Sequence, residues 1–303
     1  MTLRGCLPVL VGVVLVSALA GCTAAPVASA PATAAASTRP AHLDVSADLV
    51  ALELEFDARI GVSALDTGSG ERIGHRADER FGYASSLKAL AAAQFLRAVP
   101  AADREERVRW TASDVEAAGH SPVTSEHLAD GLTLAELAEA AVRRSDNTAL
   151  NLVLARLGGP AALDRGLEQL GDRTTEVVNG EPALSSIEPG STDDTSTASA
   201  FTSDLAEVAL GTALAPDDRA LLLEWMSGNA TGDALIRAGA PAGWSVADKS
   251  GGAGGLRADT AVVTPPGRAP IVLTVFTARN DPAVGYDDAL VARTAAVVLE
   301  ALS

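Results

Sequence analysis

Cysteine is almost absent from this chain, and the only two, Cys6 and Cys22, lie close to the amino terminus. The rest of the sequence therefore has neither a disulfide framework nor a cysteine-ligated metal site. Histidine is also sparse, and its spacing is not typical of metal ligands. We expect no metal and no cofactor, and we expect ordinary surface side chains at His42, His75, His120 and His127.

Basic and aromatic residues are few as well. Lys and Arg number 23 against 39 Asp and Glu, the net charge is −16, and no long basic run occurs. This pattern argues against a nucleic-acid-binding surface. Aromatic residues make up 3% of the chain, whereas hydrophobic residues, many of them alanine, make up 48%. The 303 residues can therefore bury a sizeable core of Ala, Leu and Val, in one large domain or two modest ones.

The amino terminus lacks an apolar run of the roughly 20 residues that a membrane-spanning helix needs. The uncharged, mostly apolar segment 5–20 follows a short positive start, as in a signal peptide. It ends in Leu19-Ala20-Gly21-Cys22, which resembles the lipobox of bacterial lipoproteins. That resemblance implies cleavage before Cys22 and acylation of this residue. The alternatives are secretion with cleavage after another small residue, or retention of the segment as a transmembrane anchor.

The segment after Cys22 is rich in Ala, Pro, Ser and Thr and has no periodicity, which predicts a flexible tether. We therefore expect a signal peptide at 1–21, a tether at 22–41 and a folded body at 42–303. Several acyl chains on Cys22 would hold a monomeric protein on the outer face of the bacterial cytoplasmic membrane, with part of it released.

Strand patterns occur at both ends of the folded body, and helical patterns lie between them. Apolar spacing predicts a first helix at 45–58 and a hairpin of 59–67 with 71–76. The stretch 85–225 is mainly helical, with the clearest segments at 87–99, 133–144 and 149–157. Strand-like segments return at 244–247, 260–264 and 270–277, before a terminal helix at 287–303. We expect an α+β fold whose antiparallel sheet, flanked by helices (about 42–83 and 228–303), meets an all-helical lobe (about 84–227) at a cleft.

Ser85 and Lys88 are the first candidates for chemistry. If a helix begins at Ser85, the two side chains share one face, one turn apart. A serine hydroxyl is a weak nucleophile until a base takes its proton, and a lysine can be that base when burial and cationic neighbours lower its pKa. The amide groups of a helix amino terminus also suit a developing oxyanion. Taken alone, an N-cap serine and a surface lysine explain the pair better.

Two further motifs follow along the chain. Ser145-Asp146-Asn147 precedes a helical pattern and suits a helix cap. Lys249-Ser250-Gly251 lies in a strand-like segment with Gly252 after it, where a substrate could lie along the strand edge, although a turn is the alternative. Together, in this order, the three motifs resemble the S-x-x-K, S-D-N and K-T-G set of class A β-lactamases and penicillin-binding proteins. The similarity runs from about residue 45 to the carboxyl terminus.

Glu181 separates these two groups of enzymes. Residues 179–185 resemble the Glu-x-x-Leu-Asn segment of the class A Ω-loop, at the family's distance from Ser85. By that resemblance, Glu181 holds the water that attacks the acyl-enzyme, whereas a penicillin-binding protein without such a base stays acylated. A surface glutamate beside Pro182 is the alternative. The chain is identified as a member of the class A β-lactamase family in lipoprotein form.

The resemblance implies hydrolysis of penicillins and cephalosporins, with antibiotic resistance, through acyl transfer to Ser85. Lys88, or Glu181 through a water, takes the proton of Ser85, and the backbone N–H groups of Ser85 and Gly252 form the oxyanion hole. Ser145, helped by Lys249, passes a proton to the lactam nitrogen. The implied substrate-binding residues are His120, Asn147, Ser185, Ser250, Gly251, Gly252 and Arg257.

Four departures from the family pattern stand out. Ser185 replaces an Asn that holds the hydrolytic water, and His120 replaces a Tyr or Trp at the mouth of the site. Asn179 replaces an arginine that pairs with an aspartate, here Asp194, so we expect a less rigid loop. Leu235 stands at one family location for the arginine that binds the substrate carboxylate. Arg257 is the replacement that we assign.

Two other functions fit parts of this pattern. One is a penicillin-binding D,D-peptidase, which Glu181 and the short body oppose. The other is a non-hydrolytic β-lactam-binding lipoprotein, which the intact Ser85, Lys88, Ser145 and Lys249 oppose.

Overall fold

The computed structural model describes residues 44–188 and 190–303. The expected signal peptide, Cys22, the tether and His42 lie outside the described residues. Within the described part of the chain, none of the helices is both long and apolar enough to cross a membrane.

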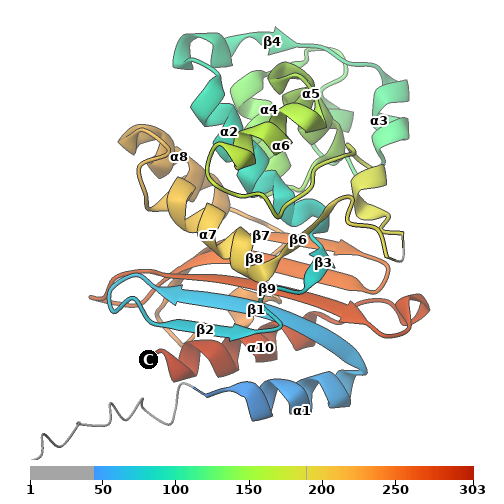
Figure 1. The fold of residues 1–303 in the computed structure, drawn as a ribbon. Coiled ribbons are helices and arrows are strands. Elements are labelled where there is room, and N and C mark those ends of the chain that lie inside the picture. The colour runs from blue at the N-terminus through green and yellow to red at the C-terminus, as the bar shows by residue number, and fades with distance from the viewer. Residues whose placement is uncertain (1–43, 189) are drawn as a thin grey trace, which may run out of the picture. The chain divides into compact units, whose positions relative to one another are not determined.

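A five-stranded antiparallel sheet forms the centre of the body, with strand order β2-β1-β9-β8-β7 (Figure 1). The amino-terminal part supplies β1 (Ala58–Asp66) and β2 (Arg72–His75). The carboxyl-terminal part supplies β7 (Ser245–Ala253), β8 (Leu256–Thr264) and β9 (Ile271–Arg279). The predicted sheet built from both chain ends is therefore confirmed. Strands β7 and β8 are longer than predicted because buried polar residues interrupt their apolar pattern: Asp248, Lys249, Ser250, Asp259 and Thr260.

Three helices cover the outer face of the sheet: α1 (Ser46–Phe56), α9 (Ile236–Gly239) and α10 (Asp288–Ala301). Their apolar sides pack on that face in one hydrophobic cluster, which includes Leu49, Ile60, Leu273 and Val298. Helix α1 ends before the predicted boundary because Asp57 adopts a left-handed conformation (φ 46°) and Ala58 already belongs to β1.

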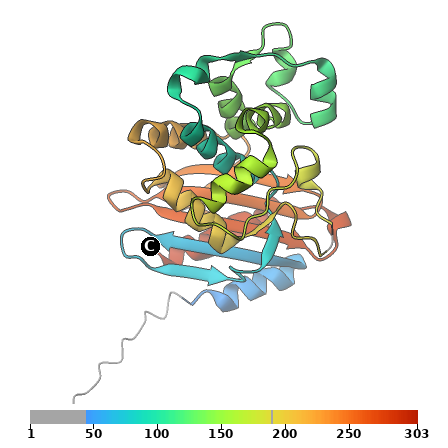
Figure 2. The same cartoon turned by 45° about the horizontal axis from the view of Figure 1, so that its top comes forward.

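The other face of the sheet meets the helical part of the chain (Figures 1 and 2). Helix α7 (Ala198–Ala209) packs directly on the sheet, and α2 (Leu87–Ala98) is surrounded by the remaining helices. Of these, α4 (Leu134–Arg143), α5 (Asn147–Leu157), α6 (Pro160–Glu168) and α8 (Pro216–Ser227) contact α2, and α3 (Ala112–Ala118) packs on α5. The short pairs β3 (Arg80–Gly82) with β6 (Thr195–Thr197), and β4 (Arg107–Val108) with β5 (Leu132–Thr133), tie the connecting segments together.

A single hydrophobic cluster joins the helices to this inner face of the sheet. Tyr83 stacks on Phe201 with ring centroids 5.9 Å apart, and Phe201 meets Phe276 of β9 edge-on at 5.2 Å. Rings paired in this way contribute about 0.5–1.5 kcal/mol beyond the burial of their area. The sheet and the helices therefore share a core, and the segment that carries Ser85 lies directly above it.

Candidate active site

Ser85 lies in a short 3₁₀ turn, Ala84–Ser86, between β3 and α2. The α-helix α2 begins at Leu87, two residues after the helix start considered at Ser85. The backbone before Ser85 is strained, with Ala84 at φ 44°. Ser85 and Lys88 still lie one turn apart, and Lys88 Nζ donates a 2.8 Å hydrogen bond to Ser85 Oγ.

Lys88 is fully buried, and its ammonium group connects four parts of the site. Besides Ser85, it donates to the Ser145 carbonyl at 2.8 Å and to Asn147 Oδ1 at 2.6 Å, and it lies 3.0 Å from Glu181 Oε1. Burial lowers the pKa of Lys88, and the Glu181 carboxylate opposes that shift. Lys88 is thus an amine that can give up a proton more readily than a free lysine.

The Ser145-Asp146-Asn147 motif is both a helix cap and part of the site. Asp146 caps α5 by accepting the Ala149 N–H at 2.9 Å, and it also binds the backbone N–H and hydroxyl of Thr124. Ser145 adopts a left-handed conformation (φ 55°), which is uncommon for a serine. Its hydroxyl oxygen lies 3.4 Å from Lys88 Nζ and 3.3 Å from Lys249 Nζ. The Asp146 cap therefore fixes the position of the motif, while the side chains of Ser145 and Asn147 face Lys88.

Glu181 lies in the same buried cluster, and only 2% of its side chain is exposed. Its Oε1 accepts a hydrogen bond from Ser85 Oγ at 3.1 Å. Asn151 of α5 holds the backbone of Glu181 on both sides, since its amide oxygen accepts the Glu181 N–H and its amide nitrogen donates to the Glu181 carbonyl, both at 2.9 Å. Sequence reasoning missed Asn151 because no short motif contains it.

Two of the departures from the family pattern, Ser185 and Asn179, lie in the loop that carries Glu181. Ser185 Oγ donates to Glu181 Oε2 at 3.3 Å. Asn179 Nδ2 donates to Asp194 Oδ2 at 2.6 Å, so the expected partner of residue 179 is the one found. Asp194 also accepts the Asn179 N–H and the Tyr83 hydroxyl. The aspartate is therefore held by several neutral donors in this chain. The expected loss of rigidity stays a prediction.

Strand β7 brings Lys249, Ser250, Gly251 and Gly252 to the opposite side of Ser85. Gly251 permits this approach, because a Cβ atom there would lie 2.6 Å from the Tyr83 carbonyl oxygen and 3.0 Å from Ser85 N. Ser250 Oγ shares a 2.6 Å hydrogen bond with Thr231 Oγ1. A residue with a side chain at position 251 would push the strand away from the nucleophile.

Lys249 is the second fully buried lysine of the site. Burial, with the nearby Lys88 ammonium, lowers the pKa of Lys249 to about 7, although Asp248 and Asp259 oppose the shift. Its ammonium group donates to the Ser250 carbonyl at 2.6 Å and to Ser145 Oγ at 3.3 Å. Both Lys249 and Lys88 therefore reach the Ser145 hydroxyl.

Ser85 opens into a cavity of about 330 Å³. Most of the predicted site residues line it: Ser85, His120, Ser145, Asn147, Glu181, Ser185, Ser250, Gly251, Gly252 and Arg257. Three residues that sequence reasoning missed line it too: Thr231, Pro182 and Tyr286. Leu235 is fully buried in the outer hydrophobic cluster and does not reach the cavity. Arg257 lines the cavity, and its assignment to the substrate carboxylate stays a prediction.

His120 and His75 differ in how far they are exposed to solvent. His120 is exposed at the cavity, with Nε2 3.3 Å from the Arg144 carbonyl oxygen. His75 was expected at the surface, but its side chain is only 12% exposed and its Nε2 lies 3.3 Å from Glu53 Oε1. The expectation is wrong for His75 because its ring lies against the buried carboxylate of Glu53 in α1. Among the residues that the structure describes, no group of three or more His, Cys, Asp or Glu is placed to hold a metal ion.

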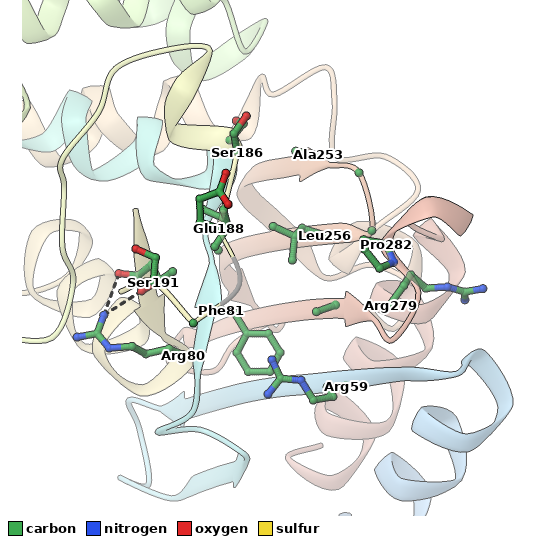
Figure 3. Close-up of a pocket in the computed structure, with 18 of the residues that line it drawn as sticks. Arg59, Arg80, Phe81, Ser186, Glu188, Ser191, Ala253, Leu256, Arg279 and Pro282 are labelled. Carbon is green, nitrogen blue, oxygen red and sulfur yellow. Dashed lines mark hydrogen bonds between the residues drawn. The ribbon is translucent and has the colours of Figure 1, made fainter. Parts of the chain in front are cut away.

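A larger hollow of about 920 Å³ lies beside the loop that follows Ser185 (Figure 3). Two of its three basic side chains, those of Arg59 and Arg80, are already engaged within the protein. Arg59 lies over the Phe81 ring and pairs with Glu79, and Arg80 donates to Thr195. In Figure 3, Arg279 points away from the hollow. None of the catalytic candidates lines this hollow, whereas Ser85, Ser145 and Glu181 line the smaller cavity.

A serine that lies between a buried lysine and a buried glutamate, beside a glycine-lined strand edge, is the arrangement of an acyl-transfer hydrolase. The β-lactamase enzyme family matches residues 44–302 of this chain. The chain is 50% identical to a β-lactamase of Bacillus amyloliquefaciens (84% of this chain, 82% of the relative) and 48% identical to one of Amycolatopsis lactamdurans (90% and 89%).

Solved structures give the same result. The β-lactamase of Streptomyces albus G superposes with a TM-score of 0.84 at 43% identity, covering 86% of this chain and 100% of that one. The class A β-lactamase of Clostridium kluyveri superposes with 0.82 at 38% identity, covering 85% and 98%. The chain belongs to the β-lactamase enzyme family, and its fold is that of class A. It is a serine β-lactamase, a hydrolase of β-lactam antibiotics that confers resistance to them.

Proposed function

We propose that this enzyme opens the β-lactam ring of penicillins and cephalosporins through an acyl-enzyme on Ser85, which a Glu181-activated water then hydrolyses. One observation carries the proposal: Ser85 Oγ lies 2.8 Å from Lys88 Nζ and 3.1 Å from Glu181 Oε1 in a single buried cluster. Both groups are within reach of the proton that Ser85 must lose. Lys88, or Glu181 through a water, is the base in this step.

The remaining residues take roles that their positions support. The backbone N–H groups of Ser85 and Gly252 receive the oxyanion, an interaction of about 3–4 kcal/mol per donor in acyl-transfer enzymes. Ser145, between the two lysines, delivers a proton to the departing lactam nitrogen. Asn147 binds the amide side chain of the substrate, and Ser250 with Arg257 binds its carboxylate.

Turnover of benzylpenicillin and of a chromogenic cephalosporin by the purified protein tests the substrate range. We expect hydrolysis of both by the wild type and none by Ser85→Ala, with the fold of the variant checked by circular dichroism. Wild-type protein that is acylated by either compound but does not release it would instead behave as a penicillin-binding protein.

We also propose that the enzyme is exported and anchored as a monomer to the outer face of the cytoplasmic membrane through lipid on Cys22. The support is the apolar segment that ends in Leu19-Ala20-Gly21-Cys22. A Cys22→Ala variant should lose membrane fractionation while keeping its specific activity. Membrane retention of this variant would contradict the lipid anchor.

A further inference from the structure

Tyr286 stands at the mouth of the active-site cavity, on the connection between β9 and α10. The residue is 45% exposed, although it lines the same cavity as Ser85. It also lies beside the oxyanion strand, since a Cβ atom on Gly252 would come within 3.0 Å of Tyr286 Cε1. A large, partly exposed aromatic side chain next to the reacting centre is placed to contact substrate.

The Tyr286 ring is held by the arginine that we assign to the substrate carboxylate. The guanidinium carbon of Arg257 lies 4.6 Å from the ring centroid, which is cation–π geometry. Arg257 Nε donates to Asp288 Oδ1 at 2.7 Å, and Nη1 donates to the Gly251 carbonyl at 3.3 Å. Its side chain is 12% exposed. The guanidinium is thus fixed, and the ring is fixed against it.

We propose that Tyr286 is a specificity-determining residue that binds an aromatic substituent on the substrate carbon next to the one that carries the carboxylate. In a cephalosporin this is the substituent at carbon 3 of the dihydrothiazine ring. The inference rests on the proposed function, in which Arg257 and Ser250 bind that carboxylate.

The geometry of the substrate places the substituent at this carbon close to Tyr286. A carboxylate in hydrogen-bond contact with Arg257 places the neighbouring ring carbon, and any group on it, a few bonds away from the guanidinium. The aromatic surface beside that guanidinium belongs to Tyr286, 4.6 Å distant. Two rings in offset or edge-to-face contact attract each other enough to change binding about 3- to 10-fold. A methyl group at the same carbon offers little of this contact.

A purely positioning role makes a different prediction. If Tyr286 acted only by holding Arg257, removing its ring would weaken every substrate that carries the carboxylate by the same factor. Direct contact with the substituent instead weakens only the substrate that has the aromatic group. Two cephalosporins with the same acyl side chain, one with a methyl group and one with a neutral heteroarylthiomethyl group at carbon 3, separate these outcomes.

The experiment measures kcat/KM for both compounds with wild type, Tyr286→Ala, Tyr286→Phe and Asp288→Asn. We expect Tyr286→Ala to lower the ratio of heteroaryl to methyl compound about 3- to 10-fold. Tyr286→Phe keeps the ring and should keep the ratio. Asp288→Asn removes the ion pair that fixes Arg257 but keeps the Tyr286 ring in the protein, and it should lower kcat/KM for both compounds. An unchanged ratio in Tyr286→Ala overturns the proposal.

The proposed function and this inference fail in different ways. Wild-type protein that hydrolyses neither benzylpenicillin nor a cephalosporin contradicts the function. If benzylpenicillin is hydrolysed but neither cephalosporin is, the proposed substrate range is wrong. In that case the same ratio is measured from the inhibition constants of the two compounds against benzylpenicillin hydrolysis. A ratio that Tyr286→Ala leaves unchanged there overturns the inference equally.

Discussion

Asp172, which follows α6, and Asp204 of α7 form a buried carboxyl pair. Their residues are 8% and 4% exposed, and the Oδ2 atom of each is buried without another hydrogen-bond partner. Burial, together with the neighbouring Asp172, raises the pKa of Asp204 to about 9. Burial alone would raise the pKa of Asp172 too, but hydrogen bonds from Asp204, Thr174 and Thr175 lower it. At neutral pH, Asp204 therefore keeps a proton and donates it to the Asp172 carboxylate.

This pairing makes folding stability depend on pH in a stated direction. The pKa of Asp204 is raised in the folded state, so its contribution is full below the unfolded value near 3.9 and is lost as pH rises toward about 9. Within this window the folded state binds one more proton than the unfolded state. The free energy of unfolding then falls by about 1.4 kcal/mol per pH unit, or about 3 kcal/mol between pH 5.5 and 8.0.

Replacing Asp204 by Asn removes this dependence, because an amide donates to Asp172 at every pH. Urea unfolding followed by circular dichroism, at pH 5.5 and pH 8.0, measures the effect. We expect the stability of Asp204→Asn relative to wild type to increase by about 3 kcal/mol over that interval. Asp130→Asn, at an exposed loop position, is the matched control and should show no such trend. A difference between Asp204→Asn and wild type that does not change with pH would refute the shared proton.

Three other substitutions test the active site. Gly251→Ala should lower kcat/KM at least about 100-fold, as the loss of an oxyanion donor does. The reason is that its Cβ would lie 2.6 Å from the Tyr83 carbonyl oxygen. Activity near wild type would contradict this packing. Ser185→Asn should speed hydrolysis of the acyl-enzyme in single-turnover measurements, since an amide can hold both Glu181 and a water; an unchanged rate would show that residue 185 does not limit it. Lys249→Arg should move the alkaline limb of kcat/KM to higher pH, because Arg stays charged where Lys249, with a pKa of about 7, does not; an unmoved limb would assign it to another group.

The sequence predicted the parts of the site that lie in short motifs. Ser85 with Lys88, and Ser145 with Asn147, are close in the chain, and each motif has a local structural reason for its shape. The order of the motifs then indicated that distant segments meet at one cleft. The antiparallel sheet was predictable for the same reason, because alternating apolar segments at both ends of the chain have few other ways to be buried.

The residues that were missed act through long-range contacts. Asn151 holds Glu181 from 30 positions away, and Asp288 holds Arg257 from 31. Tyr286 has no motif, and its role depends on a stacking contact that only the folded chain creates. His75 was assigned to the surface because its partner, Glu53, belongs to another element. A buried ionisable pair such as Asp172 and Asp204 is equally invisible in the sequence, since each residue alone is typical of a turn or a helix surface.

In the mechanism that we propose, Glu181 activates the water that hydrolyses the acyl group on Ser85. The measurement that tests it most directly is intact-protein mass spectrometry of wild type and Glu181→Gln, sampled over time after mixing with benzylpenicillin. We predict that wild type returns to its free mass as the substrate is consumed, whereas Glu181→Gln accumulates one penicilloyl adduct, located on Ser85 by peptide mapping. Release of the adduct by Glu181→Gln at the wild-type rate would contradict the role of Glu181. An adduct on another residue would contradict the role of Ser85 as nucleophile.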